Sequence, residues 1–254
     1  MARSLNYLPV AFGVGLIALT ISCSEHETLT EPSVHQPAVA VPKVPPPSID
    51  PKNFVSKIDN RFLPLTPGTT FYYKGESGGI PTRDVFFVTH QTKQILGVQC
   101  IEVHDQAYEK EVLAEDTSDW FAQDKRGNVW YFGEATRQLD EHGNVISTEG
   151  SWLAGVDGAL PGIVMLADPE RGDRYRQENA PGVAEDMARV LSLHESASVP
   201  YGAFDNLLLT EERTPLDRSS VERKFYAKDI GFLLGVTTRG GNDVTQLVNI
   251  TTGG

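Results

Sequence analysis

Residues 84–109, DVFFVTHQTKQILGVQCIEVHDQAYE, decide the fold class of this chain. They contain two runs rich in β-branched and aromatic residues, and a short connection at residues 95–98 (ILGV) joins the runs. Period-two alternation around a tight connection is typical of two antiparallel strands and not of a helix. The stretch therefore predicts a β-hairpin.

Segments of the same character follow on both sides of this hairpin, with turn signals between them at intervals of about 8 to 16 residues, as in a meander or barrel. They are residues 69–75 (TTFYYKG), 119–134 (DWFAQDKRGNVWYFGE), 144–152 (NVISTEGSW), 201–213 (YGAFDNLLLTEER), 221–227 (VERKFYA) and 231–250 (GFLLGVTTRGGNDVTQLVNI). We predict an all-β fold, in which an antiparallel meander forms a curled sheet or half-barrel with at most one or two short helices. Residues 181–193 (PGVAEDMARVLSL) fit either a helix or part of a long strand.

The first fifty residues differ in character from the rest of the chain. Residues 1–22 hold one basic residue and a short apolar run, which is typical of a signal peptide. Residues 19–23 (LTISC) resemble a bacterial lipobox, which implies a lipid anchor on Cys23, although Thr20 departs from the usual leucine. Cleavage after Ser24 is the alternative. We expect a lipoprotein-type leader at 1–22, a Pro-rich tether at 23–52 and a single β-domain at 53–252.

Charge and cysteine content exclude several classes of function. The formal net charge is −12, and Arg3 is the only charged residue before Cys23, so cleavage there leaves −13. An acidic chain of this kind disfavours nucleic acid as a partner, and we expect membrane attachment only through an N-terminal lipid. Cys100 is the second of two cysteines, so we expect no intramolecular disulfide in the mature chain and a buried, unreactive thiol. We predict a location in the cell envelope, lipid-anchored, or outside the cell.

A short motif occurs twice in the middle of the chain, as DKRGNV at residues 124–129 and DEHGNV at 140–145. Asp at the first turn position and Gly where the backbone needs a positive φ are the ordinary chemistry of a turn. In an up-and-down meander the offset of 16 residues predicts that both turns lie on the same rim, about 10 Å apart.

The best candidate for a binding site is the aromatic surface around residues 119–134. Six residues form the predicted ligand-binding set: Trp120, Trp130, Tyr131, Phe132, Glu134 and Trp152. Strict alternation places Trp130, Phe132 and Glu134 on one face of the sheet and Tyr131 on the other. Aromatic residues on both faces fit an open groove or a core that is covered on both sides, and the sequence leaves this choice open.

Two other sets of residues are candidates for a functional site. His90 and His104 pair across the hairpin, with Glu102 on the same face, if a three-residue loop joins the strands, and this set would suit zinc or copper. A two-residue loop separates the two histidines, and a solvated sheet face is the favoured interpretation. Ser77 in GESGG lacks the upstream histidine and aspartate of a serine protease, so we expect a hairpin loop there. We predict no metal and no cofactor.

Most of residues 60–250 resembles the β-domain of secreted bacterial lipoproteins of uncharacterised function, which are similar to the half-barrels of lipoprotein carriers. The resemblance rests on NRFLPLTPGTTFYYKG at residues 60–75, VPYGAFDNLLLTEE at 199–212 and ERKFYAKDIGFLL at 222–234. These motifs are turns and strand starts. The resemblance implies a curled antiparallel sheet without a cofactor, and it carries no catalytic residue to this chain.

These observations favour a cell-envelope or secreted lipoprotein with a non-catalytic β-sheet domain that binds an apolar or glycan ligand or a partner protein. The alternative is an extracytoplasmic hydrolase or lyase that acts on a saccharide with two carboxylates, Glu134 and Glu149. A purely structural role in envelope assembly is the third hypothesis.

Overall fold

The computed structural model describes residues 49–253. The predicted leader, Cys23 and most of the predicted tether lie outside the described residues. The regular secondary structure of the described part is almost all β-strand, which confirms the predicted fold class, and its one helical element is the 3₁₀ turn η1 (Pro51–Asn53). Within it no helix has the length and apolar character needed to cross a membrane.

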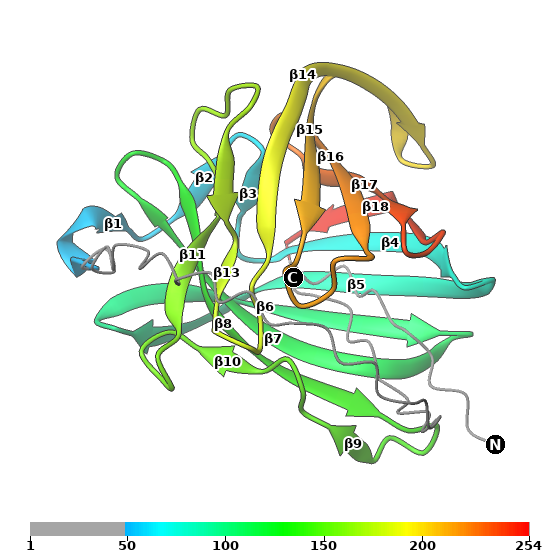
Figure 1. Cartoon of the computed structure of the whole chain (residues 1–254), viewed down its shortest axis with the longest axis horizontal. Helices are drawn as coiled ribbons and strands as arrows, with labels where there is room; N and C mark the ends of the chain where they lie inside the picture. The colour runs from blue at the N-terminus through cyan, green and yellow to red at the C-terminus, as the bar shows by residue number, and fades with distance from the viewer. Residues whose placement is uncertain (1–48, 254) are drawn as a thin grey trace, which may run out of the picture.

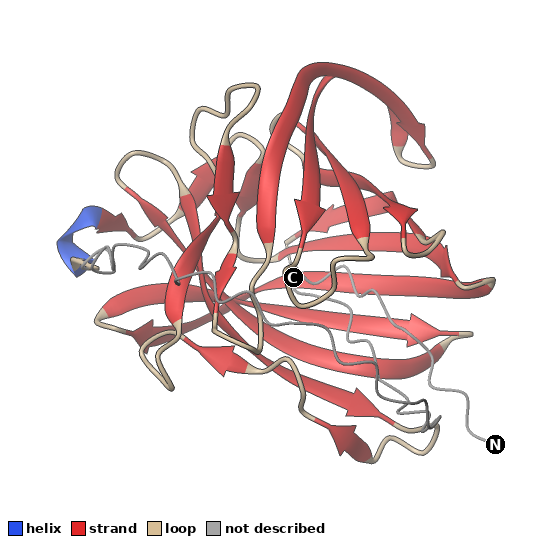
Figure 2. Ribbon diagram, in the orientation of Figure 1, coloured by secondary structure: helices blue, strands red, loops and turns tan. Residues whose placement is uncertain are grey.

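Strands of 2 to 16 residues follow one another along the chain (Figure 2). They are β1 (Phe54–Val55), β2 (Ile58–Asn60), β3 (Leu63–Leu65), β4 (Thr69–Ser77), β5 (Ile80–Ile95), β6 (Val98–Glu109), β7 (Val112–Asp124), β8 (Val129–Leu139), β9 (Val145–Ser147), β10 (Trp152–Leu153), β11 (Leu160–Met165), β12 (Arg174–Arg176), β13 (Glu178–Asn179), β14 (Met187–Val199), β15 (Gly202–Arg213), β16 (Val221–Ala227), β17 (Gly231–Arg239) and β18 (Val244–Thr252).

One large antiparallel sheet contains all of these strands except β2 and β3 (Figure 1). Its order is β12-β14-β15-β16-β17-β18-β4-β5-β6-β7-β8-β11-β13, with β1 paired to β7 and with β9 and β10 paired to β8. The strands at the two ends of this order, β12 and β13, are separated in the chain by Gln177 alone. The sheet therefore curls until its two ends meet along residues 174–179, and it forms a nearly closed barrel.

The closure requires the backbone of β11 at Gly162 to lie very close to the backbone of Gln177. A Cβ atom at this position would lie 2.1 Å from the carbonyl oxygen of Gln177, so only glycine lets the two backbones come so close.

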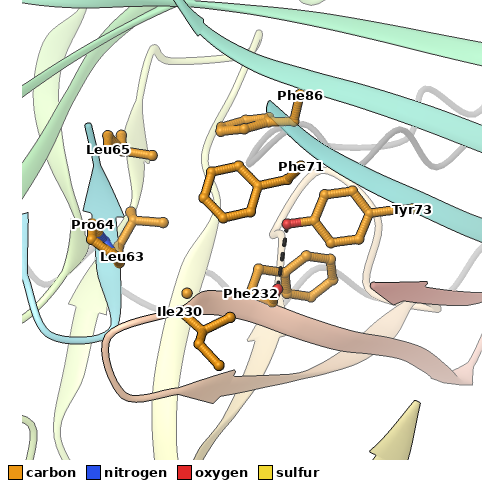
Figure 3. A pocket seen from close by; sticks show the side chains of 9 residues that line it. Leu63, Pro64, Leu65, Phe71, Tyr73, Phe86, Ile230 and Phe232 are labelled. Atoms are coloured by element: carbon orange, nitrogen blue, oxygen red, sulfur yellow. Dashed lines mark hydrogen bonds between the residues drawn. The ribbon is translucent and has the colours of Figure 1, made fainter. Parts of the chain in front are cut away.

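The hairpin of β2 and β3 packs against the inner face of β4, β5 and β17 (Figure 3). Asn60 fixes this hairpin, because its side-chain amide donates to the carbonyl groups of Gly127 and Leu166 and its Oδ1 accepts from two backbone N–H groups of the hairpin. Apolar and aromatic side chains fill the contact, and the volume left between them is about 10 Å³, roughly that of one water molecule. This part of the interior is therefore filled by the protein itself.

The two DxxGN segments are turns, but they do not share a rim. Asp124 accepts hydrogen bonds from the backbone N–H groups of Arg126 and Asn128, and Gly127 has a φ of 97°. The segment at 140–144 repeats these contacts. The first turn joins β7 to β8 and the second joins β8 to β9, so the turns lie at opposite ends of β8. The prediction of one rim was wrong because β8 alone spans the interval between them.

Two further expectations are settled by the strand pattern. Residues 181–193 contain no helix: a turn around Gly182 is followed by β14, so the strand alternative is correct.

The β5–β6 hairpin has a two-residue loop, and a shift between Val88 and Thr92 places His104 opposite Phe87. His90 and His104 therefore do not form a cross-strand pair. In residues 49–253 no group of three or more His, Cys, Asp or Glu side chains has an arrangement that would hold a metal ion.

Candidate functional site

A hollow of about 350 Å³ opens in the wall of the barrel beside β10, where that short strand leaves part of β8 uncovered. It is within the size range of small-molecule sites in proteins. Three of the six predicted site residues line it, namely Trp120, Glu134 and Trp152. The remaining lining residues are Lys93, Ala135, Ser151, Leu153, Val156, Asp157, Ala159, Ala180, Pro181 and Val183.

Trp120 forms one wall of the hollow from the outer face of the sheet. It pairs with Glu102 across β6 and β7, and its indole N–H donates to a carboxylate oxygen of Glu102 at 3.2 Å. The ammonium group of Lys93 lies 3.4 Å above the centre of the Trp120 ring, in a cation–π contact. The wall therefore already holds one positive charge against an aromatic face.

Glu134 enters the hollow from the inner face of the sheet, because a bulge in β8 reverses the alternation. The register between β7 and β8 shifts between Asp119 and Phe121, and Gly133 takes a φ of 137°. A Cβ atom on Gly133 would lie 2.4 Å from the carbonyl oxygen of Trp152. The prediction that Glu134 shares a face with Trp130 and Phe132 was wrong, since strict alternation does not hold across a bulge.

The environment of Glu134 is buried and acidic. It is 7 % exposed, it is directly opposite Asp119 in the register, and one of its oxygens accepts from the hydroxyl group of Thr136 at 3.2 Å. Burial, together with the charges of Asp119 and Glu115, raises the pKa of Glu134 well above its usual range. Among the described residues neither Glu134 nor Asp119 is ion-paired with a lysine or arginine.

Trp152 forms the second aromatic wall. Its ring packs edge-on against Tyr131, with the ring centres 5.3 Å apart, and Tyr131 stacks in turn on Phe121 at 4.7 Å. Tyr131 is fully buried behind this wall. The indole Nε1 atom of Trp152 is buried and has no hydrogen-bond partner. Trp152, which lines the hollow, therefore carries a donor that no acceptor in the protein uses.

Trp130 and Phe132 belong to a different part of the molecule. Both rings pack edge-on against Phe54 of β1, at centre-to-centre distances of 6.1 and 5.6 Å, and the indole N–H of Trp130 donates to Asp124. These two residues share a face as predicted, but they lie under β1 and do not line the hollow. The structure thus divides the predicted set into three residues at the hollow, two that pack against β1, and Tyr131, which is buried behind Trp152.

Two loops complete the hollow, and sequence analysis did not single them out. Residues 153–159 supply Val156 and Asp157, and residues 180–183 supply Val183. Val156 and Val183 are 49 % and 42 % exposed. In both loops an exposed valine adjoins a glycine with positive φ, and this combination of an apolar residue with a glycine turn is the signal that could have marked them.

Other predicted features lie apart from the hollow. Glu149 is exposed in the turn between β9 and β10, where its N–H donates to Ser147, and it does not line the hollow with Glu134. His104 contacts Asp116, which also pairs with Arg137 on the outer face. Cys100 is fully buried, and burial raises the pKa of its thiol to about 12, so it stays protonated at neutral pH.

The fold and the hollow define an all-β protein with a nearly closed sheet, and in residues 49–253 a hollow opens in this sheet beside β10. No family model and no curated protein matches this chain. Two solved structures match this chain, both with TM-scores below 0.5. A candidate exported protein with a YmcC-like fold from Bacteroides fragilis is 14 % identical, with a TM-score of 0.45, and the match covers 76 % of this chain and 100 % of that one. A candidate lipoprotein from Parabacteroides distasonis is 11 % identical, with a TM-score of 0.43 and coverages of 76 % and 99 %. At these values no residue role, ligand or location is transferred to this chain.

Proposed function

We propose that this protein is a non-catalytic binding protein of the cell envelope or the extracellular space, and that the hollow beside β10 holds a small ligand. The observation that carries the proposal is the composition of the hollow. Two tryptophans and two exposed valines line about 350 Å³ of space together with only a few polar groups. This combination of aromatic walls and a few polar groups is typical of sites that bind a flat or ring-shaped ligand.

The leader pattern at residues 1–22 supports export, since a short apolar run closed by small residues and Cys23 is typical of envelope lipoproteins. The saccharide hydrolase or lyase is the weaker reading. It needs two carboxyl groups at the reacting bond, and Glu149, the second of its predicted pair, lies outside the hollow.

Native mass spectrometry of the mature chain purified from its own cells tests the proposal. We expect a retained small molecule on the wild-type chain and its loss in Val183→Trp, where a larger side chain at the rim obstructs the hollow. Val145→Trp is the matched control, because Val145 is 52 % exposed on β9 and does not line the hollow. A wild-type chain with no retained mass, or equal retention in both variants, would count against ligand binding at this site.

Glu134→Gln separates the proposal from the enzymatic alternative. If saccharides incubated with the wild-type chain are cleaved and the variant is inactive, the protein is an enzyme and the proposal is wrong. If the hollow instead recognises a partner protein, a protein and not a small molecule is retained in a manner that Val183→Trp abolishes.

A further inference from the structure

Carboxyl groups gather behind the inner end of the hollow. Glu134 lines the hollow, and Asp119 is opposite it on the neighbouring strand β7. Glu178 of β13 lies two residues before Ala180, which also lines the hollow, and its charge interacts with that of Glu134. Asp119 and Glu178 have no exposed surface, and Glu134 is 7 % exposed. Three acidic side chains are therefore withdrawn from water in one region.

Several polar atoms in this region have no hydrogen-bond partner. They are Oδ2 of Asp119, both carboxyl oxygens of Glu178 and Nε1 of Trp152. Buried polar atoms in folded proteins are almost always paired, and an unpaired one costs about 1 to 3 kcal/mol. Trp152 lines the hollow, and an acceptor on a molecule bound there would supply the missing partner of its Nε1 atom.

The positions of the lysine and arginine side chains near the hollow indicate which charge a bound molecule would carry. Lys224 is the one lysine or arginine in the buried core of residues 49–253, and it is paired with Glu212 at 2.9 Å and Glu222 at 3.4 Å. Lys93 lies over the outer wall, where its ammonium group contacts the ring of Trp120. This contact shows that the walls of the hollow accept an ammonium group. Glu134 and Asp119 have no ion pair with a lysine or arginine among the described residues, whereas the charge of Lys224 acts on Glu178.

We propose that the ligand of the hollow carries a protonated amine close to a hydroxyl group, as in an amino alcohol or an amino sugar. This inference rests on the proposed function and narrows it. The ammonium group pairs with Glu134, which lines the hollow, and the hydroxyl oxygen accepts from the indole N–H of Trp152. Burial favours the protonated form of these carboxyl groups, and an ammonium group stabilises their ionised form, whereas a neutral or anionic ligand supplies no such charge.

Isothermal titration calorimetry on the mature chain at pH 7 tests this inference with matched pairs of probes. Glucosamine is compared with glucose, and ethanolamine with ethylene glycol. In each pair the first compound has an amine where the second has a hydroxyl group. We expect the amine to bind at least about tenfold more tightly than its neutral counterpart, since a charge-assisted hydrogen bond is about twice as strong as a neutral one.

Three variants test which residues of the hollow cause the preference for the amine. Glu134→Gln should reduce the preference for the amine at least fivefold, and Asp157→Asn at the exposed rim should reduce it less. Lys93→Met removes a like charge from the wall, so it should strengthen amine binding. If Lys93→Met weakens binding of the amine, the ammonium group of Lys93 does not act on the ligand as a like charge and the inference is wrong.

The outcomes also separate this inference from the proposed function. If the chain retains a ligand that Val183→Trp abolishes but neither amine binds better than its neutral counterpart, the hollow is a binding site and the amine inference is overturned. If no ligand is retained and no probe binds, both are overturned.

Discussion

The hydroxyl group of Tyr131 donates a hydrogen bond of 2.5 Å to Oδ1 of Asp119 inside the barrel, and both side chains are fully buried. The other carboxyl oxygen of Asp119 has no partner. Burial raises the pKa of Asp119 to about 7, although the bond from Tyr131 acts in the opposite direction. The interior of this barrel thus contains acids that ionise near neutral pH.

The stability of the protein should fall as the pH rises from about 4 to 8. Asp119 and Glu115 each have a folded-state pKa of about 7, whereas the unfolded chain ionises near pH 4. Below pH 4 both states are protonated, and between pH 4 and 7 only the unfolded state loses its protons. Above pH 7 each such group therefore lowers the free energy of unfolding by on the order of 3 kcal/mol, compared with its value below pH 4. Thermal unfolding at constant ionic strength should give a lower Tm at pH 8 than at pH 5.

Asp119→Asn is the control for this pH dependence. It removes one of the titrating groups but keeps an oxygen that accepts from Tyr131, so its Tm should fall less steeply between pH 5 and 8. A wild-type Tm that is constant or increases over this range would contradict the account of the acidic interior.

The sequence alone predicted the strands and turns but not the way in which the sheet closes. Alternation and turn residues mark most strands, because each depends on neighbours that are close in the sequence. The contact of β11 with the segment around Gln177, where the two ends of the sheet meet, depends on close backbone approach at Gly162, and no local pattern specifies it. Likewise, the shift after Val88 that separates His90 from His104 left no recognisable mark in the hairpin.

Only part of the candidate site could be predicted, because the rest also depends on backbone contacts that no local pattern specifies. Trp120 and Trp152 were identified by their type, but the side of the sheet on which Glu134 lies depends on a bulge at Gly133. A single glycine next to aromatic residues has many explanations in a sequence. Only the structure shows that this one lies against the backbone of Trp152.

Gly133→Ala should destabilise the protein by about 2 kcal/mol or more, since its Cβ atom would clash with the backbone of Trp152. Gly143→Ala is the matched control. Gly143 also has a positive φ, of 79°, but nothing lies within 4 Å of a Cβ atom there. Its cost should be about 1 kcal/mol, the strain of the left-handed conformation alone. Urea unfolding measures both values, and equal costs would show that the bulge is not tightly packed.

Asp124→Ala should cost more stability than Asp140→Ala, although the two aspartates form the same turn. Each accepts from backbone N–H groups and from an asparagine side chain, but Asp124 also accepts from the indole N–H of Trp130 at 2.9 Å. We expect about 2 kcal/mol for Asp124→Ala and a smaller loss for Asp140→Ala, which has no bond from an indole group to lose. Urea unfolding of the two variants tests the order, and a larger loss for Asp140→Ala would refute it.

The central claim is that a ligand occupies the hollow beside Trp152, and the indole N–H signals of the three tryptophans test it most directly. Trp120 and Trp130 donate to Glu102 and Asp124, whereas Trp152 has no partner within the protein. Two-dimensional ¹H–¹⁵N NMR compares the chain as purified with the chain after unfolding, removal of small molecules and refolding, and Trp152→Phe assigns the signal. We predict that the Trp152 signal moves most and the Trp130 signal stays in place. An unchanged Trp152 signal, or an equal shift at Trp130, would contradict ligand binding in the hollow.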